Sequence, residues 1–233
     1  MAIVSTNQLP RAASWRRRLL RKVVRLRGAA FAELDPEGRG DLRLIAETRD
    51  LAPLLLSDIR ALTLLACVRA ARRLGGPMAE AGVLAGGSAR LICAAKGDAA
   101  LHLFDSFDTL QEGEAEPGAT AVRDYFGPYY SDLGAVRRLL AGQEHVHFHP
   151  GWFPRSCDGL DLAGLSFVHL DLDLESSTRD ALAWFWPRMR KGGAILADDF
   201  NLAEVRRTVD NHCAEQGVSA IALPWGQAIM TKS

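Results

Sequence analysis

Short apolar runs alternate with longer segments of helical periodicity over most of this chain of 233 residues. Apolar runs of four to eight residues bounded by turn residues are typical of buried strands, whereas apolar positions three and four apart indicate amphipathic helices. Strands are predicted over residues 78–83, 101–104, 146–149, 165–170 and 194–197, and helices over 88–95, 133–141, 176–187 and 204–216. Residues 219–223 and 227–231 should form a final antiparallel pair. This alternation predicts an α/β fold: a doubly wound, Rossmann-like, seven-stranded and mostly parallel sheet.

The first 60 residues predict a helical N-terminal extension, with Pro36, Gly38 and Gly40 as a break, before a main domain over 61–233. A helix over 59–74 should begin after Asp58 as its cap. Residues 11–27 carry eight basic side chains, before the first acid of the chain, and an apolar stripe at helical spacing. They indicate a basic amphipathic helix that packs on the domain or on a second subunit, or that contacts a membrane or an anionic partner. Residues 108–128 are polar and predict a mobile loop.

Composition excludes several classes of protein. The formal net charge is zero, so nucleic acid is not expected as a partner. No apolar stretch approaches the roughly 20 residues of a membrane span, and the first residues lack the order of a secretory signal. The four cysteines are far apart and form no CxxC pair, which favours reduced thiols. A cytoplasmic protein is therefore expected.

Two acidic clusters follow two of the predicted strands. Asp171 and Asp173 come after the run 165–170, and Asp198 and Asp199 come after the run 194–197. Open α/β sheets bind ligands just outside the carboxyl ends of their strands. Four carboxylates gathered there would repel one another, and a hard divalent cation such as magnesium would relieve that repulsion. The clusters predict a metal site and an enzyme, although single acids at such positions can also cap the next helix.

A glycine-rich turn follows the first predicted strand. Gly82, Gly86 and Gly87, followed by Ser88, permit a tight turn and the close approach of a ligand, although a plain turn would need the same residues. There is no Gly-Lys-Ser/Thr for a triphosphate, and Glu80 on the strand favours a cationic ligand. Asp105 ends the second strand, where an acid accepts hydrogen bonds from ribose hydroxyls. An adenosine ligand with a charged amino-acid tail, S-adenosylmethionine, fits both acids.

Residues 76–232 resemble the macrocin-type O-methyltransferases, metal-dependent enzymes that methylate sugar hydroxyls in natural-product biosynthesis. The resemblance rests on the turn from Glu80 to Ser88, on Phe104, Asp105, Ser106 and Phe107, on Gly151, Trp152, Phe153 and Pro154, on the stretch from His169 to Thr178, and on Pro187, Gly192, Gly193, Asp198, Asp199 and Phe200. It implies a class I methyltransferase fold in which a helical N-terminal region helps to cover the site.

The resemblance also implies roles for individual residues. Asp171, Asp198 and Asp199 match the magnesium ligands, and Asp173 matches a carboxylate near the reacting hydroxyl. Asp173 is the preferred catalytic base, with Asp171 as the alternative. The cofactor-binding residues expected are Glu80, Gly82, Gly86, Gly87, Ser88, Asp105, Ser106, Phe107, Gly151 and Trp152. The expected reaction transfers a methyl group from S-adenosylmethionine, assisted by Mg2+, to a hydroxyl of a small-molecule sugar or glycoside, in a homo-oligomer.

Other interpretations stay open at this point. The acceptor could instead be a vicinal aromatic diol, as in catechol-type enzymes, or the chain could be a non-catalytic cofactor-binding subunit. An aspartate-nucleophile phosphatase also places Asp-x-Asp after an apolar strand. His145, His147 and His149 alternate and could bind zinc, but a half-exposed strand face is favoured. His169 is expected in the core, pointing away from the acids. Aromatic side chains are expected mainly in core packing, with an acceptor pocket as the alternative: Trp152, Phe153, Trp184 and Trp186.

Overall fold

The structure is a computed structural model that describes residues 34–107 and 132–233. The basic segment at 11–27 and the loop at 108–128 therefore lie outside the described residues. Seven strands form one sheet in the order β3-β2-β1-β4-β5-β7-β6. The strands are β1 (Met78–Ala81), β2 (Leu101–Asp105), β3 (Val146–Pro150), β4 (Leu165–Leu170), β5 (Met189–Ala197), β6 (Ala220–Ala222) and β7 (Ala228–Thr231). β1 to β5 pair in parallel, and β7 is antiparallel to both β5 and β6, which confirms the predicted fold class.

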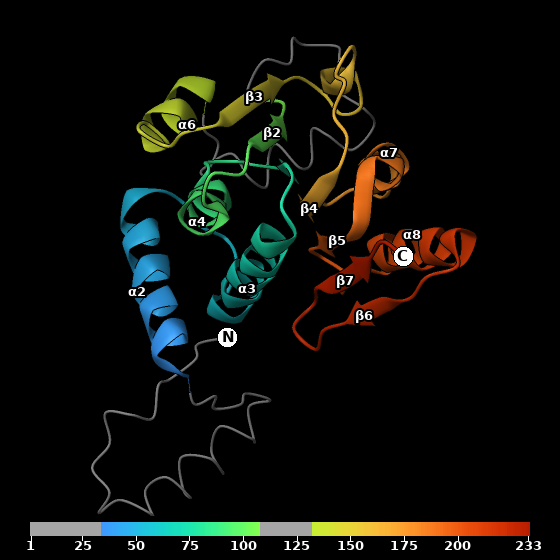
Figure 1. The fold of residues 1–233 in the computed structure, drawn as a ribbon, viewed down its shortest axis with the longest axis horizontal. Coiled ribbons are helices and arrows are strands. Elements are labelled where there is room, and N and C mark those ends of the chain that lie inside the picture. The colour runs from blue at the N-terminus through green and yellow to red at the C-terminus, as the bar shows by residue number, and fades with distance from the viewer. Residues whose placement is uncertain (1–33, 108–131) are drawn as a thin grey trace, which may run out of the picture.

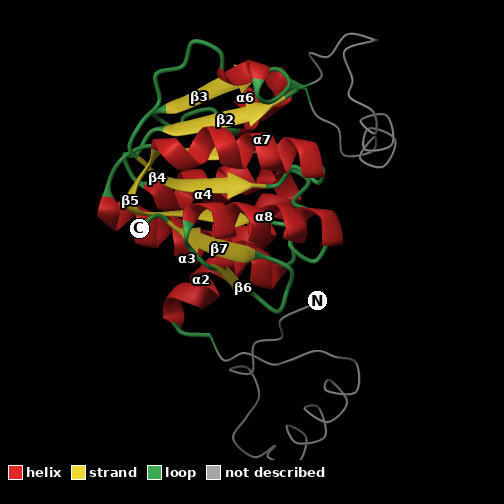
Figure 2. Cartoon of the chain, turned by 90° about the vertical axis from the view of Figure 1, so that its right-hand side faces the viewer, coloured by secondary structure: helices red, strands yellow, loops and turns green. Residues whose placement is uncertain are grey.

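Helices cover both faces of this sheet, as Figures 1 and 2 show. The N-terminal helices and two later ones pack on one face: α2 (Pro36–Leu51), α3 (Asp58–Leu74), α4 (Gly87–Lys96) and α6 (Leu133–Leu139). The other face carries α7 (Glu175–Phe185) and α8 (Ala203–Gln216). Two single turns of 3-10 helix, η3 (Arg155–Cys157) and η4 (Trp186–Arg188), complete the described elements. Because side chains alternate along a strand, Phe167 enters the first core and Val168 the second.

α3 is part of the main core. Its inward positions, Ala61, Leu64, Leu65 and Val68, are all fully buried and pack with residues of α4 and of the sheet. The boundary expected between residues 60 and 61 therefore falls inside a helix that covers the sheet. No helix among the described residues has the length and apolar character needed to cross a membrane.

Several predicted element boundaries are wrong, for identifiable reasons. Pro36 begins α2 instead of breaking a helix, because proline suits the first helical position, and the Asp35 carboxylate caps the turn by accepting from the Gly38 amide at 2.8 Å. α3 has Ser57 at its cap position, and Asp58 is its first residue. α7 begins at Glu175, so neither Ser176 nor Ser177 caps it. β5 begins at Met189, five residues before the predicted start, with an irregular register opposite β4.

Candidate active site

Four acids meet at the carboxyl edge of the sheet, as the sequence predicted. β4 and β5 are parallel neighbours, so Asp171 after one strand lies near Asp198 after the other. Asp171, Asp173 and Asp199 each place one carboxylate oxygen within 4.8 Å of the others, and His169, Asp171 and Asp198 form a second such group. The helix-capping alternative is wrong for Asp173 and Asp199, since Leu174 and Leu202 occupy the cap positions of α7 and α8.

The backbone at two of these acids is strained. Asp173 has a φ of 57° and Asp199 a φ of 52°, in the left-handed region that side chains other than glycine rarely adopt. Such strain persists only where the surrounding structure enforces it, and it is concentrated at functional sites. The turns after β4 and β5 therefore hold both carboxylates where an unstrained chain would not place them.

The acids also perturb one another. Burial, and then the charge of Asp198, raises the pKa of Asp171 well above its usual range. Burial, together with the neighbouring Asp199 carboxylate, raises the pKa of Asp173 to about 7. Neither acid is in an ion pair with a lysine or arginine among the described residues. Carboxylates crowded in this way are the donor set that a hard divalent cation would satisfy.

This crowding predicts a pH-dependent stability. Through Asp173, raising the pH from about 5 to about 8 in buffer with a chelator should destabilise the folded protein. The unfolded Asp173 releases its proton near its ordinary value of 3.8, whereas the folded one keeps it to about 7, so over this interval the folded Asp173 binds more protons. Burial lowers the pKa values of His102, His149 and His212 from 6.5, and these groups act in the opposite direction at the acidic end of the interval.

The matched variant is Asp173→Asn, which keeps the size of the side chain but cannot titrate. Its melting temperature should fall less steeply with pH than that of the wild type, measured by thermal unfolding in the same buffers. The other groups that titrate in this range are common to both proteins. Parallel curves for the two proteins would contradict a raised pKa at Asp173.

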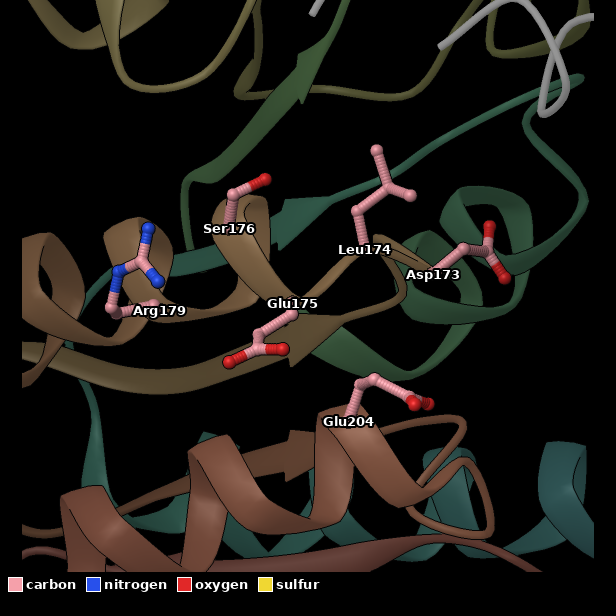
Figure 3. A pocket seen from close by; sticks show the side chains of 6 residues that line it. All are labelled: Asp173, Leu174, Glu175, Ser176, Arg179 and Glu204. Atoms are coloured by element: carbon pink, nitrogen blue, oxygen red, sulfur yellow. The ribbon is translucent and has the colours of Figure 1, made fainter. Parts of the chain in front are cut away.

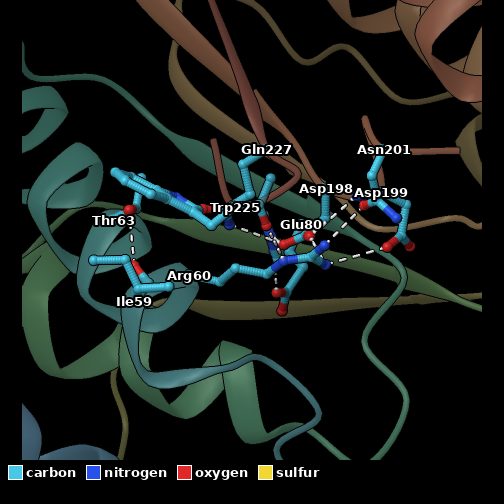
Figure 4. A network of polar contacts seen from close by, with 10 residues as sticks. Ile59, Arg60, Thr63, Glu80, Asp198, Asp199, Asn201, Trp225 and Gln227 are labelled. Atoms are coloured by element: carbon cyan, nitrogen blue, oxygen red, sulfur yellow. Dashed lines mark hydrogen bonds and ion pairs between the residues drawn. The ribbon is translucent and has the colours of Figure 1, made fainter. Parts of the chain in front are cut away.

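Asp198 is held by the protein itself. Its Oδ1 accepts from Arg60 Nη1 and from the Asp199 amide, and its Oδ2 accepts from Gln227 Nε2 at 2.9 Å (Figure 4). Burial acts to raise the pKa of Asp198, but His169, and then Arg60 and Gln227, lower it below its ordinary value. This acid is therefore ionised. Neither Arg60 nor Gln227 was anticipated. Arg60 lies 138 positions away in the sequence and has no local motif, whereas a buried Gln227 beside an apolar strand was a usable signal.

His169 joins the two ends of the site, and the expectation that it points away from the acids is wrong. Its Nδ1 lies 2.8 Å from Glu80 Oε1 on β1, and its Nε2 lies 3.6 Å from Asp198 Oδ2. Burial acts to lower the pKa of His169, but these two carboxylates raise it to about 10. The imidazole is therefore charged at neutral pH. Glu80 is fully buried, and its Oε2 has no hydrogen-bond partner among the described residues.

The glycine turn is pressed against the acids. A side chain at Gly82 would place its Cβ 1.8 Å from the carbonyl oxygen of Asp171, and one at Gly87 would lie 2.5 Å from the carbonyl of Pro53. Gly86, with a φ of 85°, precedes α4, which begins at Gly87 and buries Ser88. Close packing on the protein's own backbone thus accounts for Gly82 and Gly87, so the glycines alone do not require a ligand.

Asp105 ties that turn to the end of β2. Its Oδ2 accepts from the amides of Val83 at 2.7 Å and Leu84 at 2.9 Å, and its Oδ1 accepts from the Phe107 amide at 3.0 Å. The neighbouring hydroxyl of Ser106 lies 3.4 Å from the same Oδ1. The amide of Gly151 donates to the Asp105 carbonyl, which brings Gly151 and Trp152 to the same edge. Trp152 Nε1 is buried without a partner among the described residues.

The β3 histidines lie away from the acids. His102 Nδ1 lies 2.9 Å from His149 Nε2 in a hydrogen bond, and the His102 ring stacks on His147 with centroids 4.7 Å apart, while His145 precedes the strand. The facing nitrogens of His102 and His149 point at each other and not at a shared ion, which favours the strand-face interpretation over zinc. Phe153 and Trp186 are buried in the core as expected, and Trp184 packs on both Phe153 and Phe185.

A polar pocket of about 640 Å³ adjoins the acids (Figure 3). Its lining comes from the turn after β4 and from the first turns of α7 and α8: Asp173, Leu174, Glu175, Ser176, Arg179 and Glu204. Asp173 therefore belongs both to the acidic group and to the wall of the pocket. Carboxylates, a hydroxyl and a guanidinium suit an acceptor rich in hydroxyl groups.

The sheet order, with β7 inserted antiparallel between β5 and β6, and the acids ending β1, β2, β4 and β5 define a class I methyltransferase fold. Structures of that class match it: the O-methyltransferase NovP superposes with a TM-score of 0.67 at 23% identity, covering 77% of this chain and 82% of that one. A Bacillus cereus O-methyltransferase, in complex with SAH, gives a TM-score of 0.53 at 16% identity, covering 92% of this chain and 99% of that one.

The model of the macrocin-O-methyltransferase (TylF) family matches residues 50–223, and the chain belongs to that family. A tetracenomycin 4'-O-methyltransferase, 8-demethyl-8-(2,3-dimethoxy-alpha-L-rhamnosyl)-tetracenomycin-C 4'-O-methyltransferase of Streptomyces olivaceus, is 32% identical over 157 residues, 62% of this chain. The match spans 60% of that relative's length. Mycinamicin III 3''-O-methyltransferase of Micromonospora griseorubida is 26% identical over 208 residues, covering 82% of this chain and 80% of the relative. The family expected from the sequence is thus confirmed.

Proposed function

We propose that this chain is an S-adenosylmethionine-dependent O-methyltransferase that methylates a hydroxyl of a sugar or glycosylated natural product, assisted by Mg2+. Family membership supports the reaction class, and both curated relatives described above are named as O-methyltransferases of glycosylated natural products. The observation that carries the proposal is the arrangement of the acids. Asp171, Asp173 and Asp199 stand at the same edge as Glu80, joined to it through His169 and Asp198.

The residues around β1 and β2 fit the methyl donor. The buried Oε2 of Glu80 lacks a partner among the described residues, and a cationic amino-acid tail would supply one. The Asp105 carboxylate already accepts four hydrogen bonds within the chain, so a ribose hydroxyl would replace the Ser106 hydroxyl, the longest of the four, at Oδ1. The ten cofactor-binding residues expected from the sequence lie on β1 and in the turn and first residues of α4 after it, at or just after the end of β2, and just after β3. S-adenosylmethionine supplies an electrophilic methyl group on a sulfonium sulfur.

The acidic group fits the metal. The metal ligands proposed are those expected from the sequence, Asp171, Asp198 and Asp199. Asp171 places an oxygen within 4.8 Å of Asp199 in one group and of Asp198 in the other, and burial together with the neighbouring carboxylates raises its pKa, a cost that a divalent ion would relieve. Asp198 also accepts from Arg60 and Gln227. Mg2+ would supply Lewis-acid activation of the acceptor oxygen.

The base that best suits this reaction is Asp173. It lines the pocket, so it can reach an acceptor hydroxyl, and a carboxylate can accept the proton of that hydroxyl. The Asp173 carboxylate accepts the hydroxyl proton as the oxygen takes the methyl group. Asp171, deeper in the site, is the alternative base. The pocket walls from Glu175, Ser176 and Arg179 orient the acceptor by hydrogen bonds.

The test is methyl transfer by the purified chain. We expect S-adenosylhomocysteine to form with rhamnosylated natural products, with Mg2+ and not with excess chelator. Methyl transfer to catechols and not to glycosides would favour the vicinal-diol alternative. Cofactor binding by calorimetry without transfer to any acceptor in a broad panel would favour a non-catalytic subunit. Full activity in excess chelator would refute a role for the metal ion in the reaction. The cytoplasmic location and the homo-oligomer stay predictions, the latter testable by analytical ultracentrifugation.

A further inference from the structure

Arg60 places a permanent positive charge directly on the acids. It projects from the first turn of α3, and all three of its guanidinium nitrogens have partners (Figure 4). Nη1 pairs with Asp198 Oδ1 and, at 3.2 Å, with Asp199 Oδ1. Nη2 donates to Asn201 Oδ1, and Nε donates to the Trp225 carbonyl, each at 2.9 Å. The guanidinium is therefore fixed, because its partners come from the loop after β5 and from the β6–β7 turn.

That charge divides the four acids into two kinds. Asp198 is fully buried at its side chain and is surrounded by Arg60, Gln227 and His169. Asp171 and Asp173 have no arginine or lysine partner within the described parts of the chain, and Asp199 shares one oxygen with Arg60. An arginine does not lose its proton in proteins, so a second cation can reach this edge only against its repulsion.

We propose that Arg60 is a built-in competitor of the divalent cation. It pairs with two of the three proposed metal ligands, Asp198 and Asp199, so the metal binds less tightly than these carboxylates and Asp171 alone would allow. The position of α3 thereby sets the metal affinity of the site. This inference rests on the metal component of the proposed function and concerns binding, not turnover.

The test measures Mn2+ binding to the full chain, without acceptor or methyl donor, from the electron paramagnetic resonance signal of free Mn2+. Arg60→Gln removes the charge but keeps a donor for Asp198, and we expect it to bind Mn2+ about tenfold or more tightly than the wild type. Arg60→Lys keeps the charge, and its affinity should stay within about threefold of the wild type.

Arg69→Gln is the matched control. Arg69 lies on the same helix and also holds an aspartate, since its Nη1 donates to Asp41 Oδ2 at 2.7 Å and its Nε lies 3.1 Å from Glu37 Oε1. Neither Asp41 nor Glu37 belongs to the acidic edge. The Arg69→Gln variant therefore loses a comparable ion pair of α3, and its Mn2+ affinity should equal that of the wild type.

The outcomes separate the inference from the proposed function. If the wild type binds Mn2+ and a folded Arg60→Gln variant binds it equally or more weakly, Arg60 is only a scaffold and the inference is overturned. If neither the wild type nor any variant binds Mn2+, both the proposed metal site and this inference are refuted. The proposed methyltransferase activity is then still tested by methyl transfer in the absence of metal.

If the Arg60→Gln variant does not fold, a measurement on the wild type tests the inference instead. In protein labelled with 15N-arginine, the Nε–H resonance of Arg60, assigned through its loss in Arg60→Lys, should shift with added Mg2+ until the site is saturated. A resonance that stays in place through saturation, while the amides of Asp171 and Asp199 move, would overturn the inference.

Discussion

Asp171→Asn is expected to lower kcat for methyl transfer about 1000-fold, equivalent to about 4 kcal/mol of transition-state stabilisation, without destabilising the metal-free protein. Asp171 is the one acid that belongs to both groups, the one with Asp173 and Asp199 and the one with His169 and Asp198. An amide there removes charge at the centre of the proposed metal site. It also relieves the repulsion that raises the pKa of Asp171, so the melting temperature in chelator should equal or exceed that of the wild type.

The pairing of lost activity with retained stability makes this prediction specific. Steady-state formation of S-adenosylhomocysteine and thermal unfolding are measured on the same preparations. Asp161→Asn is the control, because Asp161 is an exposed acid just before β4 and should change neither quantity. A variant that keeps its kcat would refute the role of Asp171, and one that unfolds readily would show that the carboxylate is structural.

Gly82→Ala should destabilise the protein by about 4 kcal/mol or more, the range reached only by severe clashes or cavities. The new Cβ would lie 1.8 Å from the Asp171 carbonyl oxygen, and the φ of 89° is itself unfavourable for alanine. β1 and β4 would have to separate where the turn after β1 meets the acids. We therefore also expect the remaining folded protein to lose methyl transfer, because Asp171 would be displaced.

Gly159→Ala separates the two causes. Gly159 has a φ of 75°, yet an added Cβ would have nothing within 4 Å. Its cost should be only that of the left-handed backbone, about 1–2 kcal/mol by urea denaturation, with kcat unchanged. Similar losses in the two variants would mean that the backbone conformation, and not the contact with Asp171, determines the effect at Gly82.

The sheet was predictable because its signals are local. Runs such as 165–170 are buried on both faces, and each strand needed only its own apolar residues and bounding turns to be found. Boundaries failed where a residue acts in a less common way. Pro36 starts a helix, and the glycines at 192 and 193 lie within β5 instead of before it.

The acidic edge was predictable for the same reason, since parallel strands bring their ends together. Its internal organisation was not. That Arg60 holds Asp198, that His169 pairs with Glu80, and that Gly82 touches Asp171 are contacts between segments 89 or more positions apart. Periodicity and spacing carry no information about which side chains face one another across such separations.

α3 has a consequence for attempts to exchange acceptor preference between members of the family. A hybrid joined at residue 60 would combine a foreign first turn with the Ala61, Leu64 and Leu65 core of this chain and would lose the guanidinium that neutralises Asp198. A hybrid whose junction lies before Asp35 keeps α2, α3 and Arg60 together with the sheet that they cover. Recombination upstream of that point leaves Arg60 and its contacts with the carboxylates in place.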